Sequence, residues 1–153
     1  MKKIIFISAA ALSFFCISCK DNTATTTTTA SVKQKNSEVY KAIETGDVSK
    51  LHDYIATDAV DHNGGPNGED VKGGDSIIAM LGQIHNSFEP GLKVNVVSRA
   101  ENVDYVFTLS DMVGTTTANP VMVMPAHFKI NSRSVDGVQL QGGRAQAHWM
   151  FIG

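Results

Sequence analysis

The stretch VDYVFTLS, residues 103–110, decides the fold class because its apolar and polar side chains alternate. The odd positions from Val103 to Leu109 are apolar, whereas Thr108 and Ser110 fill even positions. Successive side chains of a strand point to opposite faces, so this pattern predicts a strand with one apolar row. We expect the odd-numbered row to face the interior of the protein.

Three further segments show the same alternation. They cover residues 92–96, 122–131 and 144–151. Pro125 interrupts the middle segment and predicts a bulge or an edge strand there, because proline has no N–H to donate to a sheet. Four such strands favour an antiparallel sheet that packs on helices from one side. The residues expected to form turns are Asn102, Gly114, Asp136, Gly137, Gly142 and Gly143.

Helical spacing of apolar residues dominates the first part of the chain. Residues 32–45 and 48–55 are predicted helices, separated by the stop signal Gly46. A third helix is expected over residues 76–88, with Asp75 as its N-cap. Helices followed by an alternating sheet predict an α+β domain.

The N-terminal segment is expected to lie outside this domain, which we assign to residues 32–153. Two lysines precede an apolar run over residues 4–15, which is typical of a signal peptide and short for a bilayer span. The sequence CISCK then resembles a lipoprotein signal, in which cleavage precedes Cys19 and a lipid joins its sulfur. Residues 1–18 are then the signal peptide, and the Thr-rich residues 19–31 form a flexible tether.

Two alternatives stay open for this N-terminal segment. Cys16 stands three positions before Cys19, where lipoprotein signals usually have Leu, Val or Ile. An ordinary secretory signal, or a disulfide between Cys16 and Cys19, would also account for the segment. Lipidation implies a protein anchored to a bacterial membrane in the cell envelope, on the periplasmic side or at the cell surface.

The charge of the chain argues against nucleic acid as a partner. The sequence has 13 Lys and Arg residues against 15 Asp and Glu residues, a formal net charge of −2, and no basic run. Proteins that bind nucleic acid need a basic patch to contact its phosphates. We therefore expect no nucleic acid as a partner.

A glycine-rich loop, AVDHNGGPNGEDVKGGDSI over residues 59–77, raises the question of a metal site. A calcium loop that began at Asp61 would need a Glu at its twelfth position, where Lys72 stands. A zinc site is not expected either, because His62 and His85 lack Cys partners and an HxxxH spacing. We therefore expect no metal and no cofactor, and we interpret the glycines as turn residues.

Four motifs, TDAVDHN, GGDSIIAML, RAENVDYVFTLSDMVGTT and AHWMFIG, follow one another in this order. Their order resembles the SnoaL-like branch of the nuclear transport factor 2-like superfamily, which includes polyketide cyclases. The resemblance implies a cone-shaped, curved antiparallel sheet that wraps round a long helix and encloses an apolar pocket. It also implies a homodimer through the outer face of the sheet. The positions that carry it are Asp58, Val60, His62, Gly74, Asp75 and Trp149.

The resemblance implies a first catalytic candidate, His62, at the mouth of the pocket. A neutral imidazole near an acid can move a proton around neutral pH. Asp111 continues the inward row of its strand and is the second catalytic candidate, at the pocket rim. The structural alternatives are a His62 ring bonded to loop backbone and an Asp111 that only ends its strand. Related enzymes often carry an Asp four residues after the tryptophan, but Gly153 stands at that position.

The remaining pocket wall is predicted from the inward rows. His127 and His148 fall on outward rows, where a dimer contact or solvent is expected. The residues expected to line the pocket are Tyr54, Tyr105, Phe107, Met122, Met124, Phe128 and Trp149.

Three functions stay open from the sequence. The first is a membrane-tethered lipoprotein whose domain binds a small apolar or amphipathic ligand. The second is a SnoaL-like isomerase, cyclase or hydrolase that uses proton transfer by His62. The third is a dimerising interaction module with a vestigial pocket. An enzyme needs at least two titratable groups near one point, whereas a vestigial pocket would be filled by Phe107, Phe128 and Trp149.

Overall fold

The structure is a computed structural model that describes residues 36–119 and 125–153. The predicted signal peptide, the lipidation site Cys19, the tether, Met122 and Met124 lie outside the described residues. Within the described part of the chain, no helix has the length and apolar character needed to cross a membrane.

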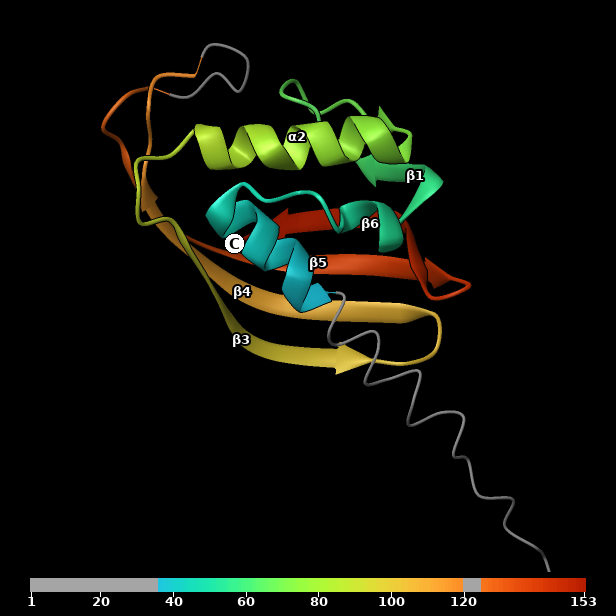
Figure 1. Cartoon of the computed structure of the whole chain (residues 1–153). Coiled ribbons are helices and arrows are strands. Elements are labelled where there is room, and N and C mark those ends of the chain that lie inside the picture. The colour runs from blue at the N-terminus through green and yellow to red at the C-terminus, as the bar shows by residue number, and fades with distance from the viewer. Residues whose placement is uncertain (1–35, 120–124) are drawn as a thin grey trace, which may run out of the picture.

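Helices and short strands come first in the described chain, and the long strands follow (Figure 1). The helix over residues 36–45 is called the N-terminal helix below. The elements after it are η1 (Leu51–Asp53), β1 (Ile55–His62), β2 (Val71–Lys72), α2 (Gly74–Asn86), β3 (Lys93–Glu101), β4 (Tyr105–Thr115), β5 (Lys129–Gln141) and β6 (Arg144–Ile152).

The strands form one curved sheet in the order β2-β1-β6-β5-β4-β3. Neighbouring strands pair antiparallel, except that β1 and β6 are parallel. The N-terminal helix and α2 lie on the concave side of this sheet (Figure 1). The predicted α+β class, with a curved sheet packed on N-terminal helices, is confirmed.

Several predicted boundaries differ from the structure. The expected helix over residues 48–55 is only the short 3-10 turn η1, because strand β1 already begins at Ile55. No strand is expected from the text IATDAVDH of β1, since its polar residues do not alternate regularly with apolar ones. The strand predicted over residues 122–131 corresponds to β5, which lies further along the chain.

Helix α2 confirms the third predicted helix, although its start differs. Its N-cap is Gly73 rather than Asp75, and no side-chain hydrogen bond caps it. Ile77, Ile78 and Leu81 are the apolar residues that α2 buries in the core. Burial of this stripe, rather than a cap, therefore holds the helix in place.

Close packing at Gly46 fixes the two helices against each other. Gly46 ends the N-terminal helix as predicted, with a φ of 76° that glycine adopts without strain. A Cβ at this position would lie 2.8 Å from Cδ2 of His85 in α2. The Nδ1 atom of His85 lies 3.2 Å from the carbonyl oxygen of Ile43. The end of the N-terminal helix is thereby attached to α2.

Two predicted turns have different outcomes. Gly142 and Gly143 connect β5 to β6 as expected, with φ values of 59° and 74°. The turn expected at Asp136 and Gly137 is wrong, because both residues lie inside β5. A Cβ at Gly137 would approach Cε1 of the Phe107 ring to 3.1 Å, so glycine serves here to let the neighbouring ring pack.

The two faces of the sheet are exchanged relative to the prediction. On β4, Val106 is 1% exposed, whereas Phe107 is 47% exposed. Strand pairing aligns Phe107, Gly137 and Trp149 across β4, β5 and β6. The expectation that this row faces the interior is wrong, because the helices cover the even-numbered row that contains Val106 and Thr108.

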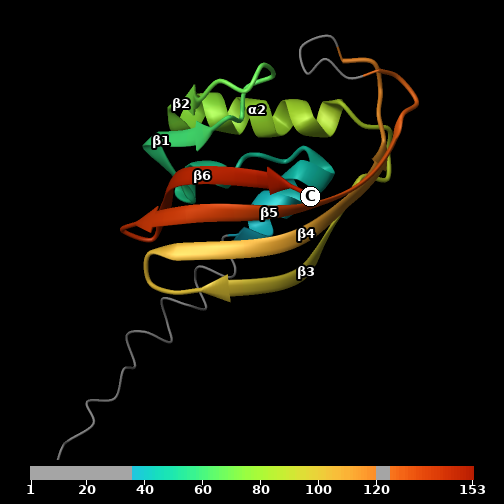
Figure 2. The ribbon, with the colours of Figure 1, turned by 180° about the vertical axis from the view of Figure 1, so that it is seen from behind.

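The odd-numbered row lies on the outer face of the sheet. Figure 2 shows the N-terminal helix behind β6 and β5 and α2 along the edge of the sheet beside β1, so no described helix covers this face. Tyr105 and Phe107 stack there with their ring centroids 6.2 Å apart. The expected homodimer through this face stays a prediction, although an exposed aromatic row is a surface that such an interface would bury.

Candidate functional site

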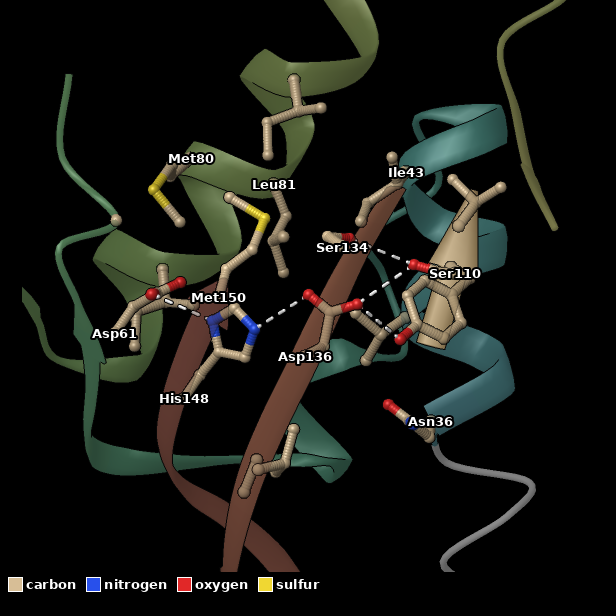
Figure 3. A pocket seen from close by; sticks show the side chains of 18 of the residues that line it. Asn36, Ile43, Asp61, Met80, Leu81, Ser110, Ser134, Asp136, His148 and Met150 are labelled. Carbon is tan, nitrogen blue, oxygen red and sulfur yellow. Dashed lines mark hydrogen bonds and ion pairs between the residues drawn. The ribbon is translucent and has the colours of Figure 1, made fainter. Parts of the chain in front are cut away.

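A cavity of about 370 Å³ lies between the two helices and the concave face of the sheet. This volume falls in the range of small-molecule sites, roughly 300–1,000 Å³. Helices and strands both supply apolar side chains, and one wall carries polar groups (Figure 3). The apolar lining includes Ile43, Ile77, Met80, Leu81, Ile84, Val94, Val106, Ile130, Val138 and Leu140.

The polar wall is organised around His148. Its Nδ1 atom lies 3.0 Å from Oδ1 of Asp61, and its Nε2 atom lies 3.4 Å from Oδ1 of Asp136 (Figure 3). The hydroxyl groups of Tyr40 and Ser110 donate to Oδ2 of Asp136 at 3.0 Å and 3.2 Å. We call these five residues the polar cluster.

The register of three strands brings this cluster together. The parallel pair β1 and β6 places Asp61 beside His148. The antiparallel pair β5 and β6 aligns Asp136 with Met150, two residues after His148. Side chains two residues apart on one strand share a face, so the Asp136 carboxylate lies diagonally across from the imidazole. Tyr40 completes the cluster from the N-terminal helix.

The two carboxylates keep the His148 imidazole charged. Burial of the imidazole acts to lower its pKa. Hydrogen bonds to Asp136 and Asp61, together with the negative charges of both carboxylates, outweigh burial and raise the pKa of His148 to about 9. At neutral pH both ring N–H groups therefore donate to carboxylates.

Tyr40 is held as a neutral donor. Burial of its hydroxyl group and the nearby Asp136 carboxylate raise the pKa of Tyr40 well above its usual range. A hydrogen bond with Thr108 and the charge of Arg99 oppose this shift without cancelling it. The Tyr40 O–H consequently remains available to Asp136 at neutral pH.

His62 lines the cavity, but its ring is engaged elsewhere. The imidazole stacks on Trp149, with centroids 4.9 Å apart and an interplanar angle of 15°. Its Nδ1 atom lies 3.2 Å from Oδ2 of Asp70, a side chain of the same loop. Trp149 is not among the cavity residues, so the His62 ring packs against the outer row. A catalytic role of His62 stays a prediction.

Asp111 lies away from the cavity. Its two carboxylate oxygens accept hydrogen bonds from Nε and Nη2 of Arg133, at 2.7 Å and 2.8 Å. These hydrogen bonds hold the pKa of Asp111 below its usual range. The expected position of Asp111 at the pocket rim is wrong, because the odd-numbered row of β4 faces outward.

The predicted pocket wall is correct only in part. Tyr54 lines the cavity as expected. Tyr105, Phe107 and Trp149 do not line it, since they belong to the outer row. Phe128 does not line it either and is largely exposed just before β5. These four assignments are corrected by the exchange of faces and by the later start of β5.

Two cavity residues that the sequence analysis did not assign to the site are direct neighbours of residues that it did assign. Asp61 precedes His62, and His148 precedes Trp149, so a shift of one residue exchanges each pair between the two faces. Asp136 is missing from the prediction because an Asp-Gly pair is typical of a hairpin turn. The polar side chains of Ser134 and Asp136 on β5 are a signal in the sequence, but only the strand register shows that Asp61 and His148 join Asp136.

The polar cluster differs from a metal site in its arrangement. Asp61 and Asp136 bind opposite nitrogens of one imidazole instead of converging on a common point. Over residues 36–119 and 125–153, no group of three or more His, Cys, Asp or Glu side chains is placed to hold a metal ion.

Comparison with known proteins assigns a family to most of the domain. The family model of the SnoaL-like domain matches residues 37–148. This range begins in the N-terminal helix and ends at His148, so it contains the whole polar cluster. No similar sequence was found among curated proteins.

Solved structures share the fold at low sequence identity. IdmH from Streptomyces antibioticus, a candidate polyketide cyclase, is 22% identical with a TM-score of 0.63, over 79% of this chain and 91% of IdmH. TsrD from Streptomyces laurentii is 18% identical with a TM-score of 0.68, over 80% and 88% of the two chains. An NTF2-like protein from Anabaena variabilis is 14% identical with a TM-score of 0.67, over 82% and 89%. These similarities establish the fold alone.

The raised pKa of His148 predicts a specific dependence of stability on pH. Because its folded-state pKa of about 9 exceeds the unfolded value of 6.5, the stabilisation is complete below pH 6.5 and is lost as the pH rises through 9. The difference in free energy of unfolding between wild type and His148→Gln should therefore shrink by on the order of 3 kcal/mol between pH 6.5 and pH 10. Urea unfolding across this range measures it.

A matched variant tests the cause of this dependence. Asp136→Asn removes one of the two carboxylates that raise the pKa of His148. The pH-dependent loss of stability should be smaller in this variant than in wild type. Parallel stability curves for wild type and His148→Gln would show that the imidazole is not charged by its neighbours.

Proposed function

Because this chain belongs to the SnoaL-like domain family, we propose that it binds a small apolar or amphipathic molecule in the cavity between its helices and its sheet. The observation that supports the proposal is an unfilled cavity of about 370 Å³ with apolar walls and one polar cluster. The aromatic residues that would fill a vestigial pocket, Phe107, Phe128 and Trp149, lie elsewhere. A binding site is therefore favoured over an interaction module.

Filling part of the cavity from one strand should weaken binding. Val138 lines the cavity, whereas Val135 pairs with Leu109 and Phe151 on the outer face of the same strand. Val138→Phe should weaken binding of the neutral fluorescent probe N-phenyl-1-naphthylamine at least tenfold, about 1.4 kcal/mol. Val135→Phe adds the same ring to the opposite face and should keep wild-type affinity. Equal affinity of both variants would refute binding in this cavity.

Proton transfer by the polar cluster is the second candidate function. It is favoured by the three titratable side chains, Asp61, Asp136 and His148, joined by hydrogen bonds at one cavity wall. In such a reaction a C–H or O–H group of the substrate would give its proton to the Asp61 carboxylate. The same proton, returned to another substrate atom, would complete an isomerisation. Between the two transfers Asp61 would hold the proton as a carboxylic acid, and the charged His148 would stabilise the negative charge left on the substrate.

Native mass spectrometry of protein purified from its own cells would identify a bound molecule for an activity assay. If that molecule is a substrate, Asp61→Asn and His148→Gln should each reduce turnover at least a hundredfold, since general acid–base groups contribute roughly 10²–10⁴-fold. His62→Ala should keep the rate within about threefold of wild type. Loss of turnover in His62→Ala alone would assign the chemistry to His62 instead.

Membrane tethering is a further part of the proposal. The lipoprotein-like signal before Cys19 and the Thr-rich residues 19–31 support a lipid anchor on a flexible tether in the bacterial cell envelope. One acyl chain gives marginal binding, so a diacylglyceryl group supplies the second chain that stable anchoring needs.

Replacing the anchored cysteine tests tethering directly. Cys19→Ser should move the protein from the membrane fraction to the soluble envelope fraction, because the thioether can no longer form. Cys16→Val leaves Cys19 in place, keeps an apolar residue three positions before it and should keep the protein in the membrane fraction. Retention of the Cys19→Ser protein on membranes would contradict lipidation at this residue.

A further inference from the structure

We infer that the cavity selects amphipathic molecules with a protonated amine over equally long molecules with a hydroxyl or a carboxylate. This inference rests on the proposed binding function and specifies the chemical class of the ligand. Two observations support it: the negative charge of the cavity wall, and a carboxylate oxygen of Asp61 that accepts no hydrogen bond from the described residues.

The charge of the polar cluster is negative in every protonation state of His148. Two carboxylates, Asp61 and Asp136, face a single imidazole. Among the described residues that line the cavity there is no Lys or Arg. Arg99 affects the pKa of Tyr40, but it does not line the cavity. Within an apolar cavity this excess of negative charge attracts a cation and repels an anion.

One carboxylate oxygen of the cluster is open. Both oxygens of Asp136 are engaged, Oδ1 by His148 and Oδ2 by Tyr40 and Ser110. Asp61 is only 4% exposed, and its Oδ1 accepts from His148. Its Oδ2 has no hydrogen-bond partner among residues 36–119 and 125–153. Because Asp61 lines the cavity, this oxygen can accept a hydrogen bond from a ligand there.

The loop beside Asp61 closes tightly over this carboxylate. A Cβ on Gly64 would lie 2.6 Å from Cγ of Asp61, so only glycine allows the loop to pass here. Gly64 and Asn63 line the cavity next to Asp61. Since Asp61 is only 4% exposed, a charged hydrogen bond from the cavity side is strengthened by the low dielectric there.

The remaining cavity surface suits an apolar chain. Ile77, Leu81 and Ile84 present an apolar stripe of α2 to the cavity. A protonated amine at Asp61 would leave its alkyl part against this stripe. N⁺–H···O⁻ hydrogen bonds are roughly twice as strong as neutral ones, so an amine should bind more tightly than an alcohol of the same length. A carboxylate should bind most weakly, because it faces like charge.

The experiment compares decylamine, decanol and decanoate, which differ only in their head groups. Each is titrated against the full chain at pH 7.5, below its micellar concentration, and displacement of bound N-phenyl-1-naphthylamine is measured. Decylamine should bind at least tenfold more tightly than decanol, and decanoate should bind more weakly than both. Asp61→Asn should reduce the preference for decylamine over decanol below threefold.

Asp111→Asn is the matched control, because Asp111 pairs with Arg133 outside the cavity. This variant should keep the wild-type preference for decylamine. Decanol or decanoate binding as tightly as decylamine would overturn the inference, as would an unchanged preference in folded Asp61→Asn. The comparison on wild type stands even if Asp61→Asn does not fold. If neither the probe nor any of the three compounds binds, the proposed binding function itself is refuted.

Discussion

Two carboxylates that share one imidazole inside an apolar cavity are the constraint on which this structure depends. Burying an ion costs several kcal/mol, roughly, unless a partner and further hydrogen bonds compensate it. His148 compensates Asp61 and Asp136 together, and Tyr40 and Ser110 both donate to the remaining oxygen of Asp136. This arrangement requires β1, β6 and β5 to keep their register and the N-terminal helix to stay in place. A polar interaction in the cavity thus depends on every layer of the fold.

The sequence predicts the fold class well because long periodic segments carry most of it. The alternation in β4 and β6 and the apolar stripe of α2 are strong local signals. Strand β1 is harder to predict, since its pairing with β6 is parallel and joins residues distant in the chain. Gly137 is also hard to predict from the sequence. An Asp-Gly pair is typical of a turn, and the reason for a glycine inside β5, the neighbouring ring of Phe107, is visible only in the structure.

The candidate site is predicted less well, and the reason is physical. Alternation separates two faces of a strand but does not say which one meets the core. Here the more apolar row of β4 lies outside, while the inner row carries Ser110 and, on β5, the polar side chains of Ser134 and Asp136. A pocket that binds a ligand tolerates such polar side chains, whereas a filled core does not. The polar inner row of β5 was the available signal for the site.

The charge state of His148 is the most direct test of this site. Long-range ¹H–¹⁵N correlation spectra of the folded protein at pH 7.5 distinguish an imidazolium from either neutral tautomer. Both ring nitrogens of His148 should show the shifts of protonated nitrogens, because each N–H donates to a carboxylate. A neutral His148 with one unprotonated ring nitrogen at this pH would contradict the paired cluster.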